Sequence, residues 1–240
     1  MSIEVRNLVK KFDDKVVIDD ISFKVDDGEI LAIVGFSGSG KSTVLKLICG
    51  LIPYDNGEVL TSEGDIAMVF QYSALFDSLN VYDNISFALH ERRDLRSKYK
   101  EEEEIKKIVS QKLELVGLKG IENKFPSELS GGMQKRVSFA RAIVTKPNTI
   151  LYDEPTAGLD PMSSTLIEDY IVRLKRETNA ASIVVTHQMS TITRTADRVI
   201  MLYDGKIVFE GTPSELLKQD NPYTKQFVTA SLDGPMKMKA

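Results

Sequence analysis

The chain has 240 residues, of which 42% are hydrophobic, enough for one large domain or two small ones with a sizeable core. Its 31 basic and 35 acidic side chains give a net charge of −4, which disfavours nucleic acid as a partner. The single cysteine, Cys49, excludes a disulfide framework and fits a reducing compartment. No apolar run approaches the roughly 18 residues that cross a bilayer, and the first residues lack signal-peptide features. We therefore expect a protein that is soluble or is held at a membrane by partners.

Residues 3–25 alternate apolar and polar positions in short runs, which predicts an antiparallel β region with turns at residues 13–14 and 26–28. Phe12 stands directly before the first of these turns. An aromatic side chain there either stacks on a flat base or lies half-buried in its strand, and this feature alone favours neither.

The next segment has the pattern of a phosphate-binding loop. Residues 30–34 are apolar without alternation, as in a strand buried on both faces of a parallel sheet. Residues 35–42 then read Gly-Phe-Ser-Gly-Ser-Gly-Lys-Ser, which matches the P-loop pattern G-x-x-x-x-G-K-[ST]. The glycines let several backbone N–H groups point at one anion, Lys41 adds a charge for the β- and γ-phosphates, and Ser42 offers a hydroxyl to Mg²⁺. The helix that follows, with Gly50 as its C-cap, would direct the positive end of its dipole at the phosphates.

A second apolar run, residues 66–70, predicts another buried strand, and Gln71 follows it. A polar amide at the end of such a strand lies where α/β sheets bind ligands. The aromatic residues of 72–95 either pack internally or form a docking surface, and periodicity does not separate these options. Residues 100–116 have a helical pattern, and the acidic run 101–104 is interpreted as a solvated first turn rather than a metal site.

A second candidate anion site precedes the next predicted helix. Ser130, Gly131 and Gly132 stand before the helical segment 134–146. A serine and two glycines at that point form either an anion site, as in the first loop, or an ordinary N-cap. Taken alone, the N-cap is the simpler interpretation.

Two adjacent carboxylates stand at the end of another apolar strand. Asp153 and Glu154 follow residues 150–152, and burying adjacent acids is costly without a cation or hydrogen-bond donors. A Mg²⁺ site would supply this compensation. A further core strand, residues 182–186, leads directly to His187. A single histidine is usually structural, but its place after a strand parallels that of the two carboxylates.

The remaining elements complete an α/β domain. Asp160, followed by proline, begins a long helix. Residues 198–209 form a hairpin around a type I′ turn at Asp204-Gly205, and a capping box opens a short last helix. The tail, residues 231–240, is interpreted as mobile or as a contact segment. We expect one compact domain over residues 1–240.

The polar groups at these strand ends would meet at one edge of a parallel sheet, around a nucleoside triphosphate. Phosphoryl transfer requires neutralised charge and an aligned nucleophile. Each requirement has a candidate: phosphate stabilisation by Lys41, Mg²⁺ binding by Ser42 and Asp153, proton acceptance from water by Glu154, and orientation of water and γ-phosphate by Gln71 and His187. The sequence therefore predicts a nucleotide-hydrolysis site.

Six motifs in one order resemble those of the ATP-binding subunits of ABC transporters, and the resemblance covers nearly the whole chain. They are the glycine loop, Gln71, Leu-Ser-Gly-Gly-Met at 129–133, Ile-Leu-Tyr-Asp-Glu at 150–154, Ala-Gly-Leu-Asp at 157–160 and His187. In that family they correspond to the Walker A motif, Q-loop, signature motif, Walker B motif with its catalytic glutamate, D-loop and H-loop. Phe12 stands at the position of the base-stacking aromatic. The signature departs from its commonest form at Met133, where the family usually has glutamine.

The resemblance implies an α/β fold: a P-loop NTPase core with a mostly parallel sheet, an N-terminal antiparallel β region and a helical subdomain at approximately residues 72–145. It implies ATP and Mg²⁺ as cofactors, and a homodimer in which ATP at Lys41 of one copy is covered by Ser130 and Gly132 of the other. The implied catalytic residues are Lys41, Gln71, Glu154 and His187; the magnesium ligands are Ser42, Gln71 and Asp153; and the nucleotide-binding residues are Phe12, Gly35, Phe36, Ser37, Gly38, Ser39, Gly40, Lys41, Ser42, Thr43, Ser130, Gly131, Gly132 and Asp160.

Residues 71–84, the signature and residues 233–235 are similar to ATPases of the Mla-type lipid trafficking systems, which serve a permease and an MCE-domain lipid-binding protein. This implies ATP-driven phospholipid transport and outer-membrane lipid asymmetry, from the cytoplasmic face of the inner membrane, with permease helices docking near residues 72–95. The alternatives are the ATPase of a polar-solute importer and a soluble ABC-type ATPase of translation or DNA repair. Proteins of the latter class usually carry two cassettes or a long coiled-coil insertion. A P-loop switch or kinase would leave residues 129–133 and His187 unexplained.

Overall fold

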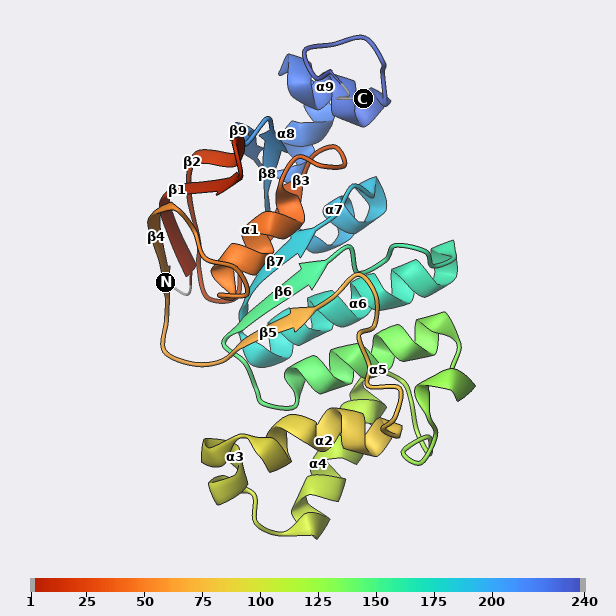
Figure 1. Ribbon diagram of the computed structural model, residues 1–240. Coiled ribbons are helices and arrows are strands. Elements are labelled where there is room, and N and C mark those ends of the chain that lie inside the picture. The colour runs from red at the N-terminus through yellow and green to blue at the C-terminus, as the bar shows by residue number, and fades with distance from the viewer. Residues whose placement is uncertain (1–2, 238–240) are drawn as a thin grey trace.

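The computed structural model describes residues 3–237 and contains two β-sheets with helices packed around them (Figure 1). The larger sheet has six strands in the order β5-β6-β7-β3-β8-β9. Its strands are β3 (Ile30–Val34), β5 (Ile66–Val69), β6 (Thr149–Asp153), β7 (Ala181–Val185), β8 (Arg198–Tyr203) and β9 (Lys206–Gly211). Only the pairing of β8 with β9 is antiparallel. The predicted α/β class with a mostly parallel sheet is confirmed.

The smaller sheet contains the predicted N-terminal antiparallel region and one further strand that the sequence did not predict. Strand β1 (Ile3–Phe12) pairs with β2 (Lys15–Val25) on one side and with β4 (Asn56–Thr61) on the other. The alternation of apolar residues follows from burial of one face only, because Ile3, Val5 and Leu8 enter a core cluster while intervening residues stay accessible.

Helices cover both faces of the larger sheet. The helices are α1 (Lys41–Ile48), α2 (Val81–Glu91), α3 (Arg93–Lys98), α4 (Glu102–Leu115), α5 (Gly131–Ile143), α6 (Pro161–Thr178), α7 (Met189–Thr195), α8 (Pro213–Lys218) and α9 (Pro222–Thr229), with a 3-10 turn at Pro126–Glu128. Successive strand residues serve different cores: Ile30 packs with residues of α5 and α6, whereas Leu31 packs with α1 and the smaller sheet. Strands β3, β6 and β7 are buried throughout. Burial on both faces explains why their sequences are mainly apolar and do not alternate with polar residues.

Helices α2 to α5 lie together at the lower end of the molecule in Figure 1, away from the smaller sheet. They fall within the stretch expected to form the helical subdomain. The structure corrects the start of α5, which begins at Gly131 instead of Gln134 because Ser130 is its N-cap: the Ser130 hydroxyl accepts a hydrogen bond from the Met133 N–H at 3.3 Å. Both signature glycines therefore belong to the first turn of the helix.

The C-terminal segment packs back onto the domain. Asp204 and Gly205 have φ angles of 49° and 79°, as a type I′ hairpin turn requires. The Gln226 side chain, on α9, bonds to the Met236 backbone N–H and C=O at 2.8 Å each, and Met236 is 1% exposed. Of the two interpretations of the tail, the described part fits the contact segment; Met238–Ala240 lie outside the described residues. None of the helices in residues 3–237 combines the length and hydrophobicity needed to cross a membrane.

One buried amide shapes the loop between β5 and α2. The side chain of Asn84 has no solvent exposure. It accepts a hydrogen bond from the Phe76 N–H at 2.8 Å. Its two N–H groups are shared among three carbonyls, those of Phe76 at 3.1 Å, Leu79 at 2.9 Å and Asn80 at 3.0 Å. A single side chain thus holds loop residues 76–80 on the first turn of α2.

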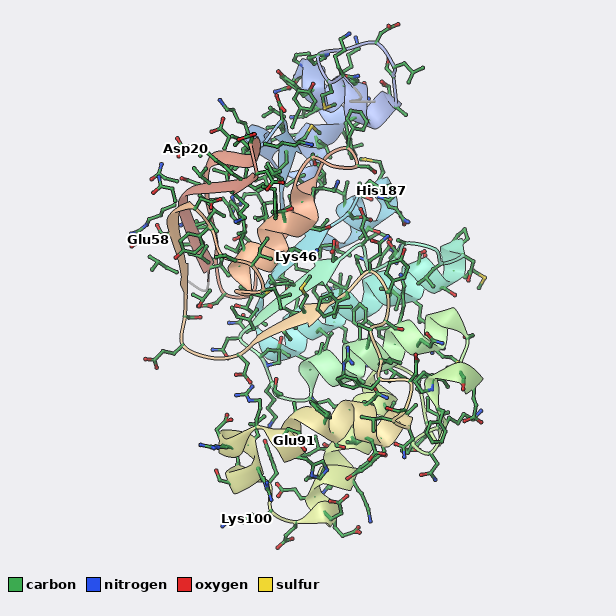
Figure 2. All side chains as sticks on the ribbon, viewed as in Figure 1. Asp20, Lys46, Glu58, Glu91, Lys100 and His187 are labelled. Carbon is green, nitrogen blue, oxygen red and sulfur yellow. The ribbon has the colours of Figure 1, made fainter. Side chains whose placement is uncertain are left out.

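We expect Asn84→Ala to lower the free energy of unfolding by about 2–3 kcal/mol, because the substitution leaves several backbone groups of the loop without their partner. Urea unfolding would measure the loss. The control is Glu91→Ala at the exposed end of the same helix (labelled in Figure 2), for which a change within about 0.5 kcal/mol is expected. Equal stability of the two variants would contradict this account of the loop.

Candidate nucleotide-binding site

The sheet order brings the predicted polar residues to one edge. Strand β7 pairs in parallel with β6 on one side and with β3 on the other, and β5 pairs in parallel with β6. The carboxyl ends of these strands therefore open at the same edge, where Figure 2 labels His187. The glycine loop follows β3, Gln71 follows β5, and the two carboxylates stand at the end of β6.

The glycine loop folds around the Lys41 side chain. Gly35 has φ 147° and Gly40 has φ 99°, so the loop uses backbone conformations that side chains oppose. The Lys41 ammonium donates to the carbonyls of Gly35 at 2.9 Å and Phe36 at 2.8 Å. Burial lowers the pKa of Lys41, an effect that the nearby Glu154 and Asp153 carboxylates oppose. A positive charge is therefore held inside the loop, close to two acidic side chains.

Ser42 and Asp153 form an oxygen pair that fits a magnesium ion. The Ser42 hydroxyl donates to the Asp153 carboxylate at 2.7 Å, and Asp153 is buried. Hydroxyl and carboxylate oxygens are ligands that Mg²⁺ accepts, usually together with phosphate oxygens and water. Across residues 3–237 no group of three or more histidine, cysteine, aspartate or glutamate side chains is arranged to hold a metal. A magnesium ion at Ser42 and Asp153 would draw its further ligands from substrate, solvent and the predicted ligand Gln71.

Glu154 has a strained backbone conformation, and only one of its carboxylate oxygens has a hydrogen-bond partner among the described residues. Its φ of 46° is unusual for a residue other than glycine, and its N–H is held by the Val185 carbonyl at 2.9 Å. One carboxylate oxygen lies 2.9 Å from Nδ1 of His187, whose side chain is 60% exposed. The second oxygen, Oε2, is buried and has no hydrogen-bond partner among residues 3–237. A buried carboxylate oxygen favours a hydrogen-bond donor, so the site suits a bound water beside this oxygen.

The segment that carries Glu154 is tied to the signature helix. The Lys135 ammonium, on α5, donates to the carbonyls of Pro155 at 3.1 Å and Ala157 at 2.6 Å. Burial lowers the pKa of Lys135, while the charge of Glu154 raises it. Sequence reasoning missed Lys135, because a lysine inside a predicted helix normally points to solvent.

The signature and D-loop residues form a separate cavity. Ser130, Gly131 and Gly132 share a cavity of about 280 Å³ with Gly158 and Asp160. Asp160 caps α6 through hydrogen bonds from the N–H groups of Met162 and Ser163, both at 3.0 Å. No residue of the glycine loop lines this cavity. Within a single copy of the chain, the two loops predicted to bind anions therefore do not line one cavity.

A third group of residues surrounds a cavity of about 470 Å³ beside the glycine loop. It is lined by Lys15, Val16, Val17, Phe36, Ser37, Gly38, Ser39, Tyr203, Asp204, Gly205 and Lys237. Phe12, the predicted base-stacking residue, is not among them; its ring is 46% exposed, and the Lys10 ammonium lies 5.2 Å from the ring centroid. Lys15 and Lys237 were not predicted, because only the folded hairpin and tail bring them to the loop.

Comparison with known proteins was consistent across sequence and structure. A family model described as ABC transporter matches residues 18–157. Protein TRIGALACTOSYLDIACYLGLYCEROL 3, chloroplastic, of Arabidopsis thaliana is 45% identical over 98% of this chain and 75% of that protein. The intermembrane phospholipid transport system ATP-binding protein MlaF of Haemophilus influenzae is 39% identical over 99% of this chain and 94% of that protein. A dimeric ATP-binding cassette solved in a post-hydrolysis state with ADP and Pi aligns with a TM-score of 0.77 at 30% identity, over 88% of this chain and 98% of that one.

The geometry of the glycine loop predicts unequal effects of two alanine substitutions. A Cβ at Gly35 would lie 2.4 Å from the Leu202 carbonyl oxygen, whereas a Cβ at Gly38, φ 79°, meets nothing within 4 Å. We expect Gly35→Ala to lower the free energy of unfolding by about 2–3 kcal/mol and Gly38→Ala by only about 1 kcal/mol. Urea unfolding of both variants would compare the losses, and a larger loss at Gly38 would contradict the described loop.

Proposed function

The chain belongs to the ABC transporter family, and we propose that it is the ATPase that powers a membrane permease in phospholipid transport. As an ABC ATPase it binds ATP and hydrolyses it to ADP and phosphate. The observation that carries the site assignment is the meeting of Lys41, the Ser42–Asp153 pair and the unpartnered oxygen of Glu154 at one edge of the sheet.

Each side chain then has a role in hydrolysis. Lys41 and the loop N–H groups bind the phosphates, and the nucleoside extends toward the cavity beside Val16. Glu154 accepts a proton from the attacking water at its free oxygen, and His187 holds the other oxygen in place.

The metal site completes this assignment. Ser42, Asp153 and the exposed Gln71 would ligate Mg²⁺. When bound, the ion would neutralise charge on the β- and γ-phosphates.

The separate signature cavity supports a homodimer. Within one copy, the cavity at Ser130 and Gly132 is not lined by the glycine loop that would bind the phosphates. A second copy placed head to tail would bring its own glycine loop to this cavity. The similar cassette crystallised with ADP and Pi is itself described as dimeric. Asp160 lines the same cavity and would lie at this interface.

The permease would dock near residues 72–95. Tyr72 is 79% exposed, and the half-exposed rings of Phe76 and Phe87 lie 5.0 Å apart. An exposed cluster of aromatic residues on a helical subdomain, approximately 72–145, suits the insertion of a partner helix. The likeness to the intermembrane phospholipid transport ATP-binding protein of Haemophilus influenzae supports a lipid substrate. The proposal also includes an MCE-domain protein in the complex and a place on the cytoplasmic face of the inner membrane.

We expect Glu154→Gln to retain Mg-ATP binding and to lose turnover by at least ~10²-fold, because the amide keeps the shape of the acid without its basicity. With ATP present, the variant should accumulate as a dimer in size-exclusion chromatography with light scattering. Adding Ser130→Arg should return it to monomers that still bind ATP, since the added side chain blocks closure of the dimer. Rapid hydrolysis by Glu154→Gln would exclude this glutamate as the base.

Purification from detergent-solubilised membranes should recover the chain with an integral membrane permease and co-purifying phospholipid. The matched variant carries Phe76→Ala and Phe87→Ala, and we expect it to keep ATP binding while losing the permease, because only the docking surface is altered. Recovery of the wild-type chain with no membrane protein would count against a transporter subunit. Recovery with a permease that carries a polar solute would identify the chain as the ATPase of a polar-solute importer.

A further inference from the structure

A buried chain of polar side chains lies behind Glu154 and His187. The hydroxyls of Thr156 and Thr191 are 3.1 Å apart, and the Thr191 hydroxyl donates to Oε1 of Glu168 at 2.8 Å. The other carboxylate oxygen of Glu168 forms an ion pair with Nε of Arg194 at 2.9 Å. Thr156 and Thr191 have no exposure and Glu168 is 1% exposed. These four side chains form what we term the threonine relay.

The direction of the hydrogen bonds in the relay follows from its chemistry. The Thr191 hydroxyl has one proton, and this proton is given to the Glu168 carboxylate. Thr191 is therefore the acceptor in its contact with Thr156, which must donate. The charge of Glu168 thus fixes the orientation of both hydroxyls, and the Arg194 guanidinium balances that charge.

The relay joins the two segments that carry the hydrolytic pair. Thr156 lies two residues after Glu154, and Thr191 lies four residues after His187, on the short helix α7. Glu168 lies on α6, a longer helix of 18 residues. Lys135, on α5, also holds the segment after Glu154, through the Pro155 and Ala157 carbonyls. The strained φ of Glu154 therefore persists between two fixed supports.

We propose that Glu168, acting through Thr191 and Thr156, is a positioning residue that keeps Glu154 and His187 at hydrogen-bond distance for ATP hydrolysis; this rests on the proposed role of Glu154. The relay touches neither the glycine loop nor the signature cavity, so it acts on hydrolysis and not on nucleotide binding. A small displacement of either segment would misalign the carboxylate and the imidazole, which now stand 2.9 Å apart.

The test compares two threonines of one helix. Thr191→Val removes the central hydroxyl of the relay with little change in shape, and Thr191→Ser restores it. Thr195→Val is the matched control: Thr195 is also buried on α7, but its hydroxyl bonds only to the Thr191 backbone carbonyl, at 2.7 Å. Steady-state ATPase assays would measure kcat and KM on the full chain, in its permease complex where that is recovered. Binding of a fluorescent ATP analogue and thermal unfolding would be measured in parallel.

For Thr191→Val we expect kcat to fall about 3- to 10-fold at a temperature where the variant is folded, with ATP affinity unchanged. Thr191→Ser and Thr195→Val should stay close to the wild-type kcat. The inference is overturned if Thr195→Val is slowed as much as Thr191→Val, if serine does not rescue, or if ATP affinity falls in parallel with kcat. Rapid hydrolysis by Glu154→Gln would instead overturn the proposed base, which the threonine variants do not test.

Discussion

The burial of two adjacent carboxylates at the end of β6 is the constraint on which the site depends. Asp153 and Glu154 are both buried, and ionised groups in such positions need compensation from outside their own strand. Ser42 and Lys41 supply it from the start of α1, and His187 supplies it from the end of β7. These elements meet because β3, β6 and β7 are parallel and in register. The Oε2 atom of Glu154 does not receive a hydrogen bond from residues 3–237, and in the proposed function a bound water donates to it.

Helix α5 contacts three parts of the molecule that serve different purposes. Its first turn lines the signature cavity, and Lys135 near its middle holds the segment after Glu154. Near its end, the Arg141 guanidinium donates to the Ala74 carbonyl at 2.7 Å and lies 5.8 Å from the Phe76 ring centroid. Burial lowers the pKa of Arg141, which fits its enclosure by this loop. Helix α5 therefore contacts the proposed docking surface, the signature cavity and the segment after Glu154.

Local sequence rules were sufficient for much of the fold. Alternation identified β1 and β2 but not β4, continuous apolar runs identified β3, β6 and β7, and Gly205 with Asp204 identified the hairpin turn. The ends of helices were less certain where a side-chain hydrogen bond fixes the first residue of the helix. The start of α5 depended on whether the Ser130 hydroxyl bonds to the helix N–H groups, which the spacing alone does not tell.

By itself, the sequence determined the residue types that face the substrate, because phosphate and Mg²⁺ require glycine amides, a lysine, a hydroxyl and carboxylates in fixed local patterns. Only the tertiary structure decided which of these groups are partners. Ser42 and Asp153 are far apart in the chain, as are the members of the threonine relay and the lysine that supports Pro155. The tertiary structure also separated the signature cavity from the glycine loop and brought Lys237 beside that loop. Such pairings depend on strand register and helix packing, which act between distant segments and leave no local signal in the sequence.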